Sequence, residues 1–137
     1  MGGHFVQGHV DTVATIAEKR PDGNAVVFRL VPRDQGVLRY VVEKGYIALD
    51  GASLTVTAVS DGEAEGKGWW EIMMIAYTQE KVVMAGKGVG EEVNVEVDQV
   101  GKYVEKSLVG WLEGRNAAGE GLRGMVERIV AEKVGGR

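Results

Sequence analysis

The chain has 137 residues, of which 45% are hydrophobic and 26% charged, a composition that indicates one folded domain rather than a disordered segment. It contains no cysteine, which excludes disulfide bonds and thiolate chemistry, and its net charge of −4 without a basic, aromatic-rich stretch argues against nucleic acid as a partner. No apolar run is long enough to span a membrane, and the N-terminus lacks the pattern of a signal peptide, so we expect a cytoplasmic protein.

Short β-rich runs separated by turn residues fill the first hundred residues. We expect six strands, at residues 4–16 (bent at Gly8), 25–31, 45–49, 53–59, 69–75 and 93–97. Turn signals at Pro21-Asp22-Gly23-Asn24 and Asp50-Gly51 separate two pairs of them, and short helices are expected after Pro32 and at 78–85. The adjacent Trp69 and Trp70 should then face opposite sides, one of them the core. This pattern favours a closed barrel or a sandwich, and closure has the advantage that it removes exposed sheet edges.

After Asp98 the apolar period changes from that of a strand to that of a helix. One helical stripe runs from Val100 to Leu112, and after a glycine-rich interruption a second runs from Leu122 to Val130. We therefore divide the chain into a barrel, residues 1–98, and a C-terminal helical segment, residues 99–137. The helices either pack on their own barrel or serve in oligomerisation, and exposed apolar stripes favour the second.

Three segments carry the residues best suited to ligand chemistry: Gly2–Asp11, Lys44–Val56 and Met74–Gln79. Each also has an ordinary explanation. Ser53 and Thr55 lie on one face of a strand and are either solvated or available to bond a heterocycle or a sugar alcohol chain. Lys44 is either a surface amine or a ligand contact, and Thr78 either caps the helical turn that follows or offers its hydroxyl to a ligand.

The two histidines, His4 and His9, are the only ones in the chain. Five residues apart on a strand they would point to opposite faces, which makes them a poor metal pair, and we expect no metal site. Either imidazole could act as a general base. For His4 we favour a buried ring that donates to a backbone carbonyl.

The first two of these segments, together with residues 93–98, resemble the riboflavin synthase α-chain family. The resemblance rests on Gly-Gly-His-x-x-x-Gly-His, then Lys-Gly-x-Ile-x-x-Asp-Gly-x-Ser-Leu-Thr-Val, then Val-Asn-Val-Glu-Val-Asp, in this order, and it covers about residues 2–104. It implies a mainly β fold: a six-stranded antiparallel Greek-key barrel with short helical insertions and a C-terminal helical tail. Family members carry two such barrels in tandem, and this sequence is similar to the second, so we expect an isolated C-terminal half.

The resemblance also implies the reaction and the site. Two molecules of 6,7-dimethyl-8-ribityllumazine dismutate to riboflavin and 5-amino-6-ribitylaminouracil, a transferase reaction that needs no cofactor or metal. The residues implied to contact the ligand are Gly8, His9, Val10, Lys44, Ser53, Leu54, Thr55, Met74, Ile75, Ala76, Tyr77, Thr78 and Gln79. We take His9 and Ser53 as candidates for removal of the methyl proton. Ala76-Tyr77 replaces the Pro-Glu of many bacterial members, so Tyr77 is a candidate stacking or hydroxyl contact.

In the family, the working site forms between the first barrel of one subunit and the second barrel of another, within a trimer. We therefore expect this chain to bind lumazine or riboflavin, to form a homo-oligomer, and to be weakly active or inactive without an N-terminal barrel. The main alternative is a non-catalytic flavin- or lumazine-binding protein, because such proteins resemble this family closely.

Overall fold

The structure is a computed structural model that describes residues 3–62 and 66–114. The chain divides into two compact units, residues 1–99 and 100–137. The first unit contains all six strands, which are β1 (Thr12–Asp22), β2 (Ala25–Pro32), β3 (Tyr46–Leu49), β4 (Ala52–Ser60), β5 (Trp69–Met74) and β6 (Glu92–Val97). Its short helices are η1 (Gln35–Tyr40), α1 (Ala76–Lys81) and η2 (Val83–Gly86).

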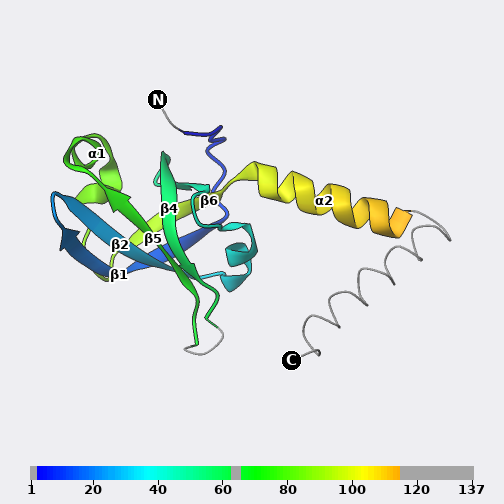
Figure 1. Ribbon diagram of the computed structural model, residues 1–137, viewed down its shortest axis with the longest axis horizontal. Coiled ribbons are helices and arrows are strands. Elements are labelled where there is room, and N and C mark those ends of the chain that lie inside the picture. The colour runs from blue at the N-terminus through cyan, green and yellow to red at the C-terminus, as the bar shows by residue number, and fades with distance from the viewer. Residues whose placement is uncertain (1–2, 63–65, 115–137) are drawn as a thin grey trace. The chain divides into compact units, whose positions relative to one another are not determined.

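The six strands form a closed antiparallel barrel in the order β1-β2-β5-β4-β3-β6 (Figure 1). Three consecutive strands, β3, β4 and β5, are neighbours, and β6 returns to pair with β3 on the far side. That spatial order is a Greek key. The predicted six-stranded Greek-key barrel is therefore confirmed.

The barrel is filled by one face of each strand. Alternate residues point inward, so β6 buries Val93, Val95 and Val97, and β4 buries Leu54 and Val56. The bulkiest fully buried side chains are Trp70, Phe28, Ile16, Leu30 and Ile47. Trp69, beside Trp70, lies on the outer face with Arg29 over its ring, as the alternation predicts.

The two predicted hairpin turns are confirmed. Asp22 pairs with Ala25 across Gly23-Asn24, and Leu49 pairs with Ala52 across Asp50-Gly51. Both residues of the second turn have positive φ, +48° at Asp50 and +84° at Gly51, which is the conformation that a two-residue hairpin of the I′ type requires.

The N-terminal segment differs from its prediction. Residues 3–11, called here the N-terminal arm, are not a strand, and β1 begins only at Thr12. Pairing with β6 sets this boundary, because the ladder between the two strands starts at Thr12 opposite Val95. At its other end β1 continues to Asp22, six residues beyond the predicted end at Ile16.

The helical insertions are present where they were expected. Asp34 caps η1 by accepting a hydrogen bond from the Gly36 N–H, and η1 buries Val37 and Leu38. The prediction that Thr78 caps a helical turn is wrong, because α1 already begins at Ala76 and Ile75 is its N-cap residue.

Of the second unit, residues 100–114 are described, and they belong to α2 (Gln99–Gly114), which covers the first predicted helical stripe. The stripe predicted from Leu122 to Val130 lies outside the described residues. Within the described ranges, a search for helices long and apolar enough to cross a membrane gives none.

Candidate functional site

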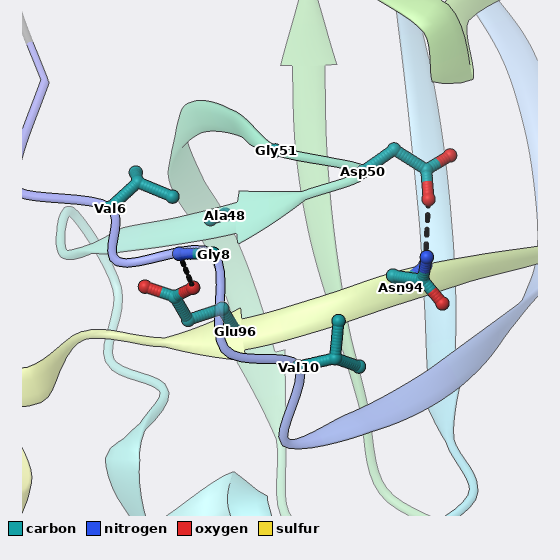
Figure 2. Close-up of a pocket in the computed structure, with 8 residues that line it drawn as sticks. All are labelled: Val6, Gly8, Val10, Ala48, Asp50, Gly51, Asn94 and Glu96. Carbon is teal, nitrogen blue, oxygen red and sulfur yellow. Dashed lines mark hydrogen bonds between the residues drawn. The ribbon is translucent and has the colours of Figure 1, made fainter.

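The N-terminal arm lies across the outer faces of β3 and β6 (Figure 2). It is held by Glu96, whose Oε1 accepts hydrogen bonds from the Gly8 and His9 N–H groups and whose Oε2 accepts one from Gln7, at 2.8 Å each. Glu96 points outward, between the inward Val95 and Val97, yet it is only 7% exposed. The arm is therefore a fixed part of the barrel surface.

A shallow pocket of about 260 Å³ lies where the arm crosses the two strands. Figure 2 shows the arm residues on one side and the strand residues on the other. The lining residues are Val6, Gly8 and Val10 of the arm, Ala48, Asp50 and Gly51 of β3 and its turn, and Asn94 and Glu96 of β6.

The rim of this pocket is rigid. Asp50 accepts hydrogen bonds from the Asn94 N–H through Oδ1, at 2.8 Å, and from the Lys87 ammonium group through Oδ2, at 2.7 Å. Lys87 also donates to the Glu92 carbonyl. The turn between β3 and β4 is thus tied to β6, which fixes the start of β4.

The start of β4 brings Ser53 against the arm. The Ser53 Oγ lies 2.7 Å from His4 Nδ1, and the His4 ring stacks on Tyr46 of β3, with centroids 5.2 Å apart and an interplanar angle of 11°. Our expectation that His4 donates to a backbone carbonyl is wrong, since its partner is a hydroxyl. The structure places His4, rather than His9, beside Ser53.

Thr55 extends this surface along the outer face of β4. Thr55 pairs with Tyr46 of β3 on one side. On the other side, Val56 pairs with Ile72 of β5, which brings the outward-facing Met73, the residue after Ile72, next to Thr55. Tyr46 and Met73 are both part-exposed. We call Ser53, Thr55, Tyr46 and Met73 the β4 face. It offers hydroxyl groups flanked by an aromatic ring and a thioether, a combination suited to a flat heterocycle with polar edges.

Two of the predicted contact residues have their side chains in the barrel core. Leu54 is 8% exposed and Met74 is fully buried, so only their backbone groups can reach a ligand. The Met74 carbonyl already accepts a hydrogen bond from the Gln79 amide.

Lys44 and residues 75–79, which were also predicted as contacts, lie outside the barrel core. Ile75, Ala76 and Tyr77 are exposed, where β5 passes into α1. Thr78 is part-buried within α1. Lys44 is exposed just before β3, with φ at +69° and its N–H donating to the Val56 carbonyl.

Sequence reasoning favoured a structural role for His4 and missed Tyr46, Met73 and Glu96. The alternation of β3, β5 and β6 marks the last three as outward-facing, which is also the pattern of solvated residues. What separates Glu96 from a solvated carboxylate is a contact with residues almost ninety positions away, and no local pattern indicates such a contact.

A second charged cluster lies on β1, β2 and β5, where Glu71 is two residues from Met73 on the outer face of β5. The Glu71 carboxylate, with its side chain 9% exposed, accepts hydrogen bonds from Arg20 and Arg29. The bond from Arg20 lowers the pKa of Glu71, burial opposes this, and Arg29 adds to the lowering. These groups neutralise one another across three strands, which is a stabilising role.

A family model described as the lumazine-binding domain matches residues 7–98 of the chain. The chain belongs to the lumazine-binding domain family. The matched residues run from Gln7 in the N-terminal arm to just past the end of β6, so the match includes the β4 face and residues 7–11 of the arm.

The predicted likeness to riboflavin synthase is also confirmed. The chain is 64% identical over 106 residues to riboflavin synthase of Schizosaccharomyces pombe, covering 77% of this chain and 48% of that protein. It is 47% identical over 134 residues to riboflavin synthase of Saccharomyces cerevisiae, covering 97% and 56%. This lumazine-binding domain chain therefore spans about half the length of the curated relatives it matches.

Two solved structures share the lumazine-binding barrel. The protein LumP complexed with 6,7-dimethyl-8-(1'-D-ribityl) lumazine matches with a TM-score of 0.54 at 19% identity, over 68% of this chain and 47% of that one. LumP complexed with riboflavin matches with a TM-score of 0.51 at 19% identity, over 64% and 44%. At this identity the likeness shows a common fold.

Proposed function

We propose that this barrel binds 6,7-dimethyl-8-ribityllumazine or riboflavin on the β4 face and works as the C-terminal half of a riboflavin synthase site. The observation that carries the proposal is the outward pair Ser53 and Thr55, set between Tyr46 and Met73 at the edge of the arm. Hydroxyl groups of this kind can bond the polar edge of a pteridine, while the flanking apolar groups pack on its ring.

The ribityl chain needs several hydrogen-bonding groups beside the ring. Lys44, whose N–H donates to the Val56 carbonyl of β4, and Thr78 and Gln79, which lie in α1 directly after β5, are the proposed donors and acceptors, with Ile75 and Tyr77 as apolar walls. Gly8 and Val10, which line the pocket at β3 and β6, and His9 between them are the proposed contacts from the arm.

The proposed reaction transfers a four-carbon unit from one lumazine to another. One molecule gains the unit and becomes riboflavin, and the other loses it and becomes 5-amino-6-ribitylaminouracil, so the atoms balance without an external oxidant or cofactor. The first step removes a proton from the 7-methyl group. Ser53, with His4 at its hydroxyl, and His9 on the arm are the candidates to receive it.

We further propose that a second lumazine-binding barrel completes the site. Two substrates must react face to face, and a single open face can position only one of them. We expect this chain alone to bind lumazine and to form riboflavin slowly or not at all.

Turnover measured by riboflavin absorbance, with and without an added N-terminal barrel of a riboflavin synthase, tests this proposal. We expect riboflavin formation to rise by at least about tenfold when the second barrel is present, because reaction then becomes a proximity-assisted step. Bound lumazine that is never consumed, even with the second barrel, would instead indicate a non-catalytic binding protein.

We also propose that α2 takes part in assembly into a homo-oligomer. Val104, Leu108 and Trp111 share one side of this helix at helical spacing, and a single helix cannot bury such a side by itself. A second copy of the helix offers the same surface, which is the requirement of a symmetric interface.

A further inference from the structure

We infer that Glu96 is a positioning residue of the lumazine site: it fixes the N-terminal arm across the barrel so that His4 lies against Ser53. The inference rests on the proposed function, because it concerns the same site. It assigns a role to a carboxylate that contacts neither the β4 face nor a proposed ligand atom.

The first step is the location of Glu96 in the sheet. Glu96 pairs with Ala48 on β3, and Ala48 pairs with Ser53 on β4. The three residues therefore form one row on the outer face, across three adjacent strands. The arm follows this row, since its residue His4 is bonded to Ser53 at one end and its residues 7–9 are bonded to Glu96 at the other.

The second step is the strength of the anchor. Three consecutive backbone N–H groups converge on one carboxylate, at 2.8 Å each. Hydrogen bonds to an ionised acceptor are about twice as strong as neutral ones. Gly8 has φ at +82°, a conformation that turns successive N–H groups toward one anion. Ala48, under the arm, is only 1% exposed, so the arm lies close to the sheet.

The third step is the direction in which the arm can move. On the C-terminal side of the contacts with Glu96, the arm is fixed to β6 by Asp11. The Asp11 N–H donates to the Val95 carbonyl, and the Asp11 carboxylate accepts a hydrogen bond from the Val97 N–H. On the N-terminal side of the contacts with Glu96, His4 is held by a single side-chain hydrogen bond to Ser53 and by its ring stack on Tyr46. Loss of the middle anchor should therefore release the His4 end and leave the Asp11 end in place.

Glu96→Gln tests this with little change in side-chain volume. The amide keeps one acceptor oxygen and gains two donors, so at least one arm N–H then faces another donor. Glu92→Gln is the matched control, because it makes the same chemical change on the outer face of the same strand. The Glu92 carboxylate is bonded to Arg33 at the exposed surface rather than to the arm.

Two quantities are measured on the full chain: amide hydrogen exchange by NMR and the Kd for 6,7-dimethyl-8-ribityllumazine by fluorescence titration. For Glu96→Gln we expect exchange at Gln7, Gly8 and His9 to accelerate, and the Kd to rise, each by about tenfold, with strand amides unchanged. For Glu92→Gln both quantities should stay within about twofold of the parent chain.

Gly8→Ala is the second variant, and it carries the test if Glu96→Gln fails to fold. A Cβ at Gly8 meets no atom within 4 Å, so this variant strains the arm through its positive φ without a clash. It should accelerate exchange at Gln7 and His9 as Glu96→Gln does, and exchange is its deciding quantity, because Gly8 is itself a proposed ligand contact.

The inference is overturned if Glu96→Gln leaves arm exchange unchanged, or if the arm is released and the Kd stays the same. A parent chain that binds no lumazine overturns the proposed function and this inference together. A parent chain that binds lumazine, with variants that bind it equally well, overturns only the role of Glu96.

Discussion

Ser53 illustrates how the surroundings of one side chain change its chemistry. A serine on a solvated strand exchanges its hydrogen bonds with water, whereas the Ser53 hydroxyl is bonded to the His4 ring, which is itself stacked on Tyr46. An imidazole at this distance can accept the hydroxyl proton or hold its orientation. Ser53 is therefore better suited to act on a bound ring than its position on an outer strand face indicates.

The ion pairs of Glu71 lead to a prediction about how the stability of the barrel depends on pH. Its lowered pKa means that the bonds to Arg20 and Arg29 stabilise the barrel above the ordinary pKa of a glutamate, about 4.3, and that this stabilisation is lost as the pH falls through the lower folded-state value. Glu71→Gln should cost about 1–2 kcal/mol of unfolding free energy at pH 7, a figure reduced because Arg20 is half-exposed.

Urea unfolding at a series of pH values measures this effect. The difference between Glu71→Gln and the parent chain should shrink toward zero under acid conditions, because the parent carboxyl is then protonated as well. Glu92→Gln, which removes an exposed ion pair, should cost less than about 0.5 kcal/mol throughout. A Glu71→Gln penalty that is constant with pH would show that lost packing, not charge, is responsible.

Residue identity alone could predict part of the candidate site. Ser53 and Thr55 were expected on one outward face from strict alternation in β4, and the structure places them there. Leu54 was expected as a contact as well, but the same alternation directs its side chain into the core. The pairing of Ser53 with His4 could not be predicted, because it depends on the path of the arm.

At the scale of elements, turns and strands were predictable while the arm was not. Asp50-Gly51 and Gly23-Asn24 have local conformational preferences that decide their structure. Residues 4–10 have a β-like composition, but a strand needs a partner, and the β6 ladder reaches only as far as Thr12. The arm instead obtains its hydrogen bonds from a side chain, Glu96, on the outer face of that ladder.

The helix α2 yields a prediction about assembly at this scale. Leu108→Asp places a charge in the middle of its apolar side, so we expect the molar mass measured by light scattering to fall toward that of one chain, because burial of an unpaired carboxylate is costly. Lys106→Asp, on the polar side of α2, is the control and should leave the mass unchanged. An unchanged mass for Leu108→Asp would exclude this side of α2 from the interface.

At the scale of the whole molecule, the barrel is a closed unit with its candidate binding surface on the outside. The interior is filled by side chains such as Trp70 and Phe28, so a heterocycle has to bind on an outer face. An outer face covers one side of a ligand only, which is the physical reason for our proposal that a second barrel completes the site.

The central claim, that the β4 face binds lumazine, is tested most directly by one fluorescence titration with 6,7-dimethyl-8-ribityllumazine on three proteins: the parent chain, Thr55→Val and Thr57→Val. Both variants exchange a hydroxyl for a methyl group on the outer face of β4, but the Thr57 hydroxyl is already bonded to the Glu71 carbonyl. We expect saturable binding by the parent chain, a Kd raised about five- to tenfold by Thr55→Val, and little change for Thr57→Val. Equal affinity of all three proteins, or no binding by the folded parent chain, would contradict the claim.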